Sequence, residues 1–200
     1  MSATNRNGLA RHAGDFYETP SWAIDVVLDV LGVTEAFDGY VIDPGTGTGA
    51  IAHRVAERAP RADVRGIELN EELLAKARAC RADSIAWEQA DWLTWRADGQ
   101  PDLVIGNPPY GPRDDRTLGE RFIWKALDVA GKKSTVAMLL RLSFLVPKTR
   151  RKLRAAFGKP NIHALERRPS FNGSGTDATD YAWFVWGPKS AGRWDVITAP

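Results

Sequence analysis

A tetrad of unusual composition, Asn-Pro-Pro-Tyr, occupies residues 107–110 and follows the apolar run Asp-Leu-Val-Ile-Gly. Two consecutive prolines cannot continue a strand, and neither donates a backbone hydrogen bond. The tetrad therefore offers hydrogen-bond acceptors, the Asn107 side-chain oxygen and backbone carbonyls, next to the aromatic ring of Tyr110. A turn would explain the prolines, but it does not require an amide and a ring on either side of them.

A second stretch, Asp-Pro-Gly-Thr-Gly-Thr-Gly at 43–49, concentrates glycine. The glycines allow the backbone to turn sharply and to approach a ligand closely, and the helix expected after them adds the positive end of its dipole. A plain strand-to-helix turn would look similar. No Lys-Ser or Lys-Thr pair follows, so a phosphate-binding P-loop is a poor match. The spacing of Gly47, Gly49 and Ala52, with Glu68 at the end of a later strand, also fits a dinucleotide fingerprint.

Three acids, Asp43, Glu68 and Asp91, each lie at the end of a different expected strand. Asp43 would repel a pyrophosphate but suits a cationic ligand, which disfavours a nicotinamide cofactor. The Glu68 carboxylate could accept both hydroxyls of a ribose, Asp91 could accept the exocyclic amine of adenine, and Trp92 could flank the ring. A lone acid at a strand end is often only a cap or a turn residue. Three of them together indicate S-adenosylmethionine, an adenosine with a positively charged amino-acid tail.

Apolar runs and helix signals alternate along the chain. Thr19 is expected to cap a first helix that Gly32 ends, and Asn70 to cap a later one. Strands are expected at 40–43, 62–69, 84–91, 102–106, 134–142, 161–168 and 180–186. This alternation predicts an α/β fold with a largely parallel sheet. Ligands bind beyond the carboxyl ends of such strands, where the glycines, the acids and the tetrad all fall.

From residue 16 to residue 186 the chain resembles class I S-adenosylmethionine-dependent methyltransferases, and most of all the small phage- and prophage-type N6-adenine DNA methyltransferases. The motifs that carry the resemblance are Phe-Tyr-Glu-Thr-Pro, Asp-Pro-Gly-Thr-Gly-Thr-Gly, Ile-Glu-Leu-Asn, Gln-Ala-Asp-Trp and Asn-Pro-Pro-Tyr. It implies a Rossmann-like class I methyltransferase fold, with a seven-stranded, mostly parallel sheet flanked by helices. A single catalytic domain is then expected over 16–200, after a flexible tail at 1–15.

The resemblance also assigns site residues. Those implied to hold S-adenosylmethionine are Phe16, Tyr17, Thr19, Pro20, Asp43, Pro44, Gly45, Thr46, Gly47, Gly49, Glu68, Leu69, Asp91, Trp92 and Asn107. Those implied to be catalytic are Asn107, Pro108, Pro109 and Tyr110. Those implied to contact the substrate are Tyr110, Phe171, Lys148, Arg150 and Arg151.

The tetrad's expected chemistry follows from the target. An adenine amino nitrogen is a poor nucleophile because its lone pair is delocalised into the ring. The Asn107 oxygen and the Pro108 carbonyl would accept its two N–H groups and direct the lone pair at the methyl group, while the prolines keep both acceptors rigid. Tyr110 would stack on the base and Phe171 would form the opposite wall; a core aromatic is the alternative for Phe171. The base would be flipped out or arrive single-stranded, and the loops 111–117 and 170–180 would close over it.

The expected partner is a nucleic acid, with DNA favoured. The net charge of +2 is too small to indicate a polyanion, but Lys-Thr-Arg-Arg-Lys-Leu-Arg at 148–154 could lie along phosphates. It could also be a solvated helix face. No dedicated target-recognition region is evident, so specificity is low, comes from the two loops, or comes from a separate partner. Adenine in RNA, a glutamine side chain in a protein, and a non-catalytic nucleic-acid-binding module with a vestigial cofactor fold remain alternatives.

The bulk composition narrows the class of protein. The 200 residues are 44% hydrophobic and 26% charged, as in ordinary globular chains. No apolar run approaches the ~18 residues of a membrane span, and the start has no signal-peptide core. The single Cys80 excludes an internal disulfide framework, and we interpret it as structural. No metal site and no membrane partner are expected, and the expected location is the cytoplasm. Trp183 and Trp186 are expected in the core.

Overall fold

The computed structural model describes residues 18–80, 84–109, 117–171 and 178–198. Its centre is one sheet in the order β3-β2-β1-β4-β5-β7-β6-β8. The strands are β1 (Tyr40–Pro44), β2 (Asp63–Glu68), β3 (Ile85–Gln89), β4 (Leu103–Gly106), β5 (Thr135–Arg141), β6 (Asn161–Leu165), β7 (Tyr181–Trp186) and β8 (Trp194–Ile197). Strands β1 to β5 are parallel, whereas β7 runs antiparallel to both β5 and β6. The predicted α/β fold with a mostly parallel sheet is confirmed.

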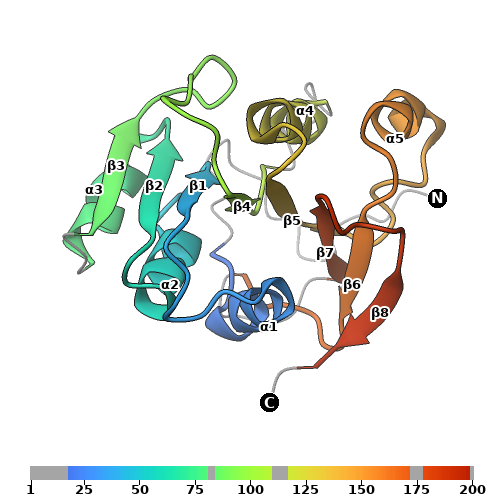
Figure 1. The fold of residues 1–200 in the computed structure, drawn as a ribbon, viewed down its shortest axis with the longest axis horizontal. Coiled ribbons are helices and arrows are strands. Elements are labelled where there is room, and N and C mark those ends of the chain that lie inside the picture. Colours follow the sequence, from blue (N-terminus) through green and yellow to red (C-terminus); the bar gives the residue numbers. More distant parts are fainter. Residues whose placement is uncertain (1–17, 81–83, 110–116, 172–177, 199–200) are drawn as a thin grey trace.

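Helices cover both faces of the sheet (Figure 1). They are α1 (Ser21–Leu31), α2 (Ala50–Arg58), α3 (Glu71–Ala79), α4 (Leu118–Ala130) and α5 (Arg151–Phe157), the last preceded by a 3-10 turn, η1 (Lys148–Arg150). Helices α1 and α2 contribute to the core on one face, and α4 and α5 to the core on the other. Trp183 and Trp186 are 0% and 3% exposed, so their prediction as core residues is confirmed.

Local signals set the ends of two helices as the sequence predicts. Gly32 ends α1 in the left-handed conformation, with φ of 69°, which glycine adopts without the steric cost of a Cβ. The Asn70 side chain accepts hydrogen bonds from the backbone amides of Glu72 and Leu73 at the start of α3. This cap fixes the turn between β2 and α3, which directly follows Glu68, the last residue of β2.

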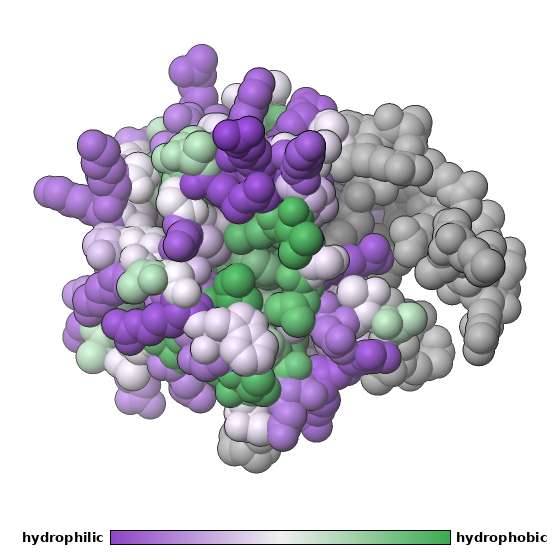
Figure 2. Space-filling model, turned by 90° about the vertical axis from the view of Figure 1, so that its right-hand side faces the viewer, coloured by the Kyte–Doolittle hydropathy of each residue, from purple (hydrophilic) through white to green (hydrophobic). Residues whose placement is uncertain are grey.

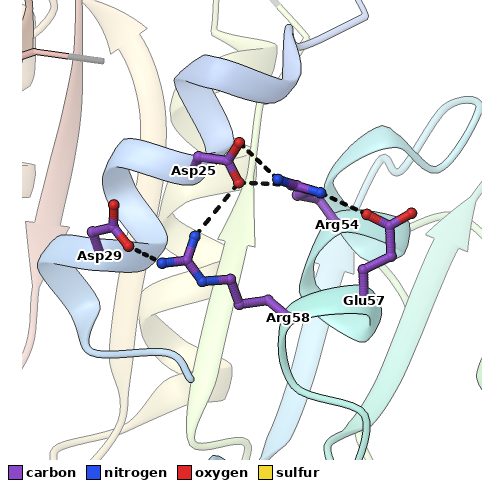
Figure 3. Close-up of polar contacts among 5 residues, drawn as sticks. All are labelled: Asp25, Asp29, Arg54, Glu57 and Arg58. Carbon is purple, nitrogen blue, oxygen red and sulfur yellow. Dashed lines mark hydrogen bonds and ion pairs between the residues drawn. The ribbon is translucent and has the colours of Figure 1, made fainter. Parts of the chain in front are cut away.

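Helix α1 is held against the rest of the molecule by polar contacts on its outer side (Figure 3). The Arg54 guanidinium binds both carboxylate oxygens of Asp25, at 2.6 and 2.9 Å, and also pairs with Glu57 at 2.8 Å. Arg58 pairs with Asp29 and approaches Asp25. A fork-to-fork Arg–carboxylate pair is geometrically specific even where its energy is small. The network therefore fixes how α1, and the segment just before it, sits over α2.

An eighth strand extends the sheet beyond the seven that the sequence predicts. Strand β8 pairs in parallel with β6, and Asp195 lies beside His163, with 2.6 Å between its carboxylate and the imidazole. Trp194 and Val196, on the other face of this edge strand, are 60% and 53% exposed. Figure 2, which faces the side of α5 and β8, shows apolar residues gathered between hydrophilic ones. The stretch 194–197 mixes charged and apolar residues over only four positions, so its pattern alone did not indicate a strand.

None of the helices in the described ranges combines the length and the apolar character needed to cross a membrane.

Candidate active site

The glycine stretch forms a tight turn between β1 and α2. Gly45, Gly47 and Gly49 all have positive φ, at 66°, 59° and 84°, so the predicted sharp turn is confirmed. The backbone amides of Gly45 and Thr46 donate to the carbonyl of Ile67, at 2.8 and 3.0 Å. The turn therefore packs against the carboxyl end of β2, where the ribose-binding acid was expected.

Asp43 lies beneath this turn and is 1% exposed. One of its carboxylate oxygens accepts from the Thr46 hydroxyl at 2.5 Å and from the Ala52 backbone amide at 3.2 Å. Burial raises the pKa of Asp43 to about 7, an effect that these two hydrogen bonds oppose and that Glu68 increases slightly. The expectation of a direct contact with a cationic ligand does not fit this burial. Asp43 instead braces the turn and the first turn of α2.

Glu68 links the ends of β1 and β2. Its carboxylate accepts from the backbone amide of Gly47 at 2.9 Å and from that of Asn70 at 2.8 Å, one bond on each oxygen. A carboxylate has about four acceptor sites, so two bonded amides leave capacity for the two hydroxyls of a ribose. Leu69, the next residue, is 65% exposed. This apolar surface beside Glu68 fits the side of a flat ring.

Asp91 follows β3 and begins a turn, in which its carbonyl accepts from the backbone amides of Thr94 and Trp95 at 3.0 and 2.8 Å. Its carboxylate accepts from the Leu93 amide at 2.9 Å, and it is only partly buried. The neighbouring Trp92 is 2% exposed and its indole N–H donates to the carbonyl of Phe122 at 3.2 Å. The expectation that Trp92 flanks an adenine ring does not fit the structure, because the side chain is packed in the core beneath α4. The role of Asp91 toward the adenine amine stays a prediction.

Asn107 stands at the carboxyl end of β4, partly buried, with Pro108 buried and Pro109 exposed after it. The Asn107 side-chain nitrogen donates to the Thr19 hydroxyl at 3.2 Å. Thr19 is 4% exposed and does not cap α1, whose N-cap is Pro20. The prediction that Thr19 caps the helix is therefore wrong. The Thr19 hydroxyl instead accepts a hydrogen bond from the first residue of the tetrad, Asn107.

A second contact fixes the backbone of the tetrad. A Cβ built on Gly119, in the first turn of α4, would lie 2.9 Å from the carbonyl oxygen of Pro109. Real Cβ atoms are not found that close to a backbone oxygen, so only glycine lets α4 approach Pro109 in this way. The tetrad is thus packed between α4 and the segment before α1.

Several expected site residues lie elsewhere or outside the described residues. Phe16, Tyr17 and Tyr110 fall outside them, as do most of the loops 111–117 and 170–180. Phe171 is 6% exposed and packs edge-on against Tyr181, with 5.0 Å between ring centroids. It lies in the core and presents almost no surface, so the expectation that it forms a wall for a base does not fit the structure.

The basic segment divides into inward and outward cations. Arg150 is 16% exposed, pairs with Glu120 of α4, and lies 4.8 Å above the Phe144 ring. These contacts hold the Arg150 guanidinium inside the protein. The expectation that Arg150 contacts phosphates therefore does not fit the structure. Lys148 and Arg151 are exposed, and their role in binding a polyanion stays a prediction.

Taken together, the turn, the strand-end acids and the tetrad gather at the carboxyl edge of β1 to β4. A parallel sheet that continues through an antiparallel β7, with helices on both faces, is the class I methyltransferase fold. A methyltransferase from Listeria monocytogenes assigned to that class superposes with a TM-score of 0.74 at 14% identity, covering 96% of this chain and 68% of that one. At such identity the likeness concerns the fold alone.

The chain belongs to the methyltransferase small domain family, whose model matches residues 23–168. It is 41% identical over 96 residues to a release factor glutamine methyltransferase of Streptomyces coelicolor, covering 46% of this chain and 32% of the relative. It is 36% identical over 77 residues to a tRNA1(Val) (adenine(37)-N6)-methyltransferase of Glaesserella parasuis, covering 36% and 32%. It is 27% identical over 137 residues to the modification methylase CviBIII of Paramecium bursaria Chlorella virus NC1A, covering 60% and 35%. The chain thus spans about a third of the length of these relatives.

The family and the fold identify S-adenosylmethionine as the cofactor. The residues present fit it. Glu68 has acceptor capacity toward the ribose, Leu69 offers exposed apolar surface for the adenine, and Asp91 lies next along the same edge. The three glycines of the turn after β1 have no side chains, so a cofactor at this edge of the sheet could approach the backbone closely.

Proposed function

We propose that this chain transfers the methyl group of S-adenosylmethionine to the N6 amine of adenine in DNA. The observation that carries the proposal is the position of Asn107. It stands at the carboxyl end of β4, on the same edge as the strand-end acids, with its side-chain nitrogen bonded to Thr19. The Asn107 side chain carries both a carbonyl oxygen and an amide nitrogen, and the proposal assigns the oxygen to the target amine, which needs an acceptor.

The proposed chemistry needs acceptors more than a base. S-adenosylmethionine supplies, when bound, an electrophilic methyl group on a sulfonium. The Asn107 oxygen and the Pro108 carbonyl would each accept one N–H of the target amine, which draws its nitrogen toward tetrahedral geometry. Because Pro108 is buried and α4 packs closely on Pro109, little ordering is left for the reaction. The nitrogen becomes acidic only as the new C–N bond forms, and its proton then passes to water.

DNA is favoured as the carrier of the adenine for two reasons. The similarity to a viral modification methylase extends over 60% of this chain, and the exposed cations at 148–152 suit phosphates. An amine inside a duplex is out of reach of such a site, so the base would be flipped out. We also propose that a separate partner contributes to target recognition.

A glutamine side chain is the second candidate. Its amide nitrogen is flat, with a delocalised lone pair and two N–H groups, as the adenine amine is. The Streptomyces coelicolor release factor glutamine methyltransferase is the relative with 41% identity. The tetrad does not separate the two targets, since both offer two N–H groups to two acceptors.

Labelled S-adenosylmethionine tests the proposal. The protein is incubated separately with duplex DNA, single-stranded DNA, transfer RNA and a cell protein extract, and each labelled product is digested and identified by mass spectrometry. We expect N6-methyladenine from DNA. Label found only in N5-methylglutamine would support the second candidate, and label only in transfer RNA would keep the adenine target but exclude DNA.

A further inference from the structure

The loop at 142–147, which follows β5, has an unusual construction. Strands β4 and β5 are parallel neighbours, so this loop leaves the sheet at the edge where the tetrad stands. It holds Phe144, Leu145 and Val146 in two consecutive turns, closed by the bonds from the Phe144 amide to the Arg141 carbonyl at 2.8 Å and from the Val146 amide to the Ser143 carbonyl at 3.1 Å.

Two arginines brace the loop from inside. Arg150 lies over the Phe144 ring and pairs with Glu120, while Phe144 also packs edge-on against the buried Phe184, with 6.4 Å between centroids. Arg154 donates to the carbonyls of Leu145 and Pro147. The backbone of the loop is therefore fixed although its surface is open.

The same contacts tie the loop to the catalytic segment. Glu120, which receives Arg150, adjoins Gly119, and Gly119 is the residue that closely approaches the Pro109 carbonyl. A continuous path of packed groups thus leads from the tetrad through the first turn of α4 to the loop.

The tip of this braced loop is apolar and is flanked by cations. Val146 is 78% exposed, the highest value among the large apolar side chains of the described residues. Lys148, Arg151 and Lys152 follow within six positions and are exposed, and their side chains have no hydrogen-bond or ion-pair partner among the residues that the structure describes. An exposed apolar residue alone is ordinary. A rigid one beside three unpaired cations is complementary to a polyanion with an apolar interior.

We propose that loop 142–147 is a wedge for double-stranded nucleic acid. Lys148, Arg151 and Lys152 contact backbone phosphates, and Val146 enters the base stack next to the target and helps to hold it open. Apolar side chains inserted between base steps unstack them in this manner, and a flipped base needs such help only in a duplex. The inference rests on the proposed function, because it assumes a nucleobase target.

The test compares duplex and single-stranded DNA of one sequence as methyl acceptors for the wild type and Val146→Ala. We expect the variant to methylate the duplex about tenfold more slowly and the single strand within about twofold of the wild type. Val196→Ala, which shortens an exposed valine on β8 at the far edge of the sheet, is the matched control and should change neither rate.

Two results would overturn the wedge while leaving the proposed function in place. An unchanged rate of duplex methylation in Val146→Ala would show that Val146 does not insert between the stacked bases. An equal loss on both forms would show that the loop supports the catalytic segment instead. A wild type that methylates neither form of DNA contradicts the proposed function, and the wedge with it, which distinguishes that failure from the first two.

Discussion

Replacing Asp43 by Asn removes a buried charge while keeping its hydrogen bonds. Both bonds, from the Thr46 hydroxyl and the Ala52 amide, converge on a single carboxylate oxygen, and the carboxamide oxygen of Asn can accept them in the same place. The substitution therefore isolates the electrostatic cost of Asp43 from its bracing of the glycine turn.

The magnitude follows from the pKa. Burial raises the pKa of Asp43 from 3.8 to about 7 in the folded protein. Because the folded value is the higher one, the folded state binds the proton more tightly, and its stability is greatest below about pH 4 and falls as the pH rises to about 7. At about 1.36 kcal/mol per pH unit, this group alone lowers the free energy of unfolding by about 4 kcal/mol over that window.

Urea unfolding at pH 5 and pH 8 measures the effect. We expect Asp43→Asn to lose less stability than the wild type between these two values, by about 3 kcal/mol. At pH 8 the variant should be the more stable protein by about 1–3 kcal/mol, after about 1–3 kcal/mol for burying the new amide group. Asp38→Asn, at a carboxylate that is 74% exposed, is the control. The same pH dependence in Asp43→Asn and wild type would refute the assignment of a buried, costly carboxylate.

Three further predictions concern the site. Thr19→Val removes the hydroxyl bonded to Asn107, a hydrogen bond worth about 0.5–1.5 kcal/mol, so kcat should fall about 2- to 12-fold with little change in the cofactor KM. Thr19→Ser keeps a hydroxyl and should restore kcat. A changed KM with normal kcat would place Thr19 in cofactor binding alone. Glu68→Gln should weaken S-adenosylmethionine binding about tenfold or more in calorimetry, because a hydrogen bond to a charged group contributes about 1.5–3 kcal/mol; unchanged affinity would remove Glu68 from the ribose site. Arg151→Ala combined with Lys152→Ala should reduce the slope of log K against log salt for duplex DNA by about 2, and an unchanged slope would show that these cations are only solvated.

The sequence predicts the elements whose signals are local. Gly32 and Asn70 mark helix ends by their own backbone and side-chain preferences, and the glycines after β1 have the conformation that their spacing indicates. The acids at the ends of β1, β2 and β3 could be assigned to one edge because parallel strands bring their carboxyl ends together.

Tertiary contacts decide what the sequence does not predict. The Thr19 hydroxyl is adjacent to a helix start, which indicates a cap, yet it bonds to a residue 88 positions away. Trp92 and Arg150 each belong to a motif that suggests a ligand, but partners on α4, 30 positions away, draw both inward. No pattern within one segment reveals such partners.

The kinetics of Asn107→Ala test the central claim most directly. If Asn107 and Pro108 supply the acceptors that prepare a flat amine, the variant should transfer methyl groups at least about a hundredfold more slowly in single turnover, as when a fixed transition-state hydrogen bond is lost. Its affinity for S-adenosylmethionine in calorimetry should stay within about threefold, since the acids that we expect to hold the ribose and the adenine, Glu68 and Asp91, lie at the ends of other strands, β2 and β3. Methyl transfer near the wild-type rate, with cofactor bound normally, would contradict the account.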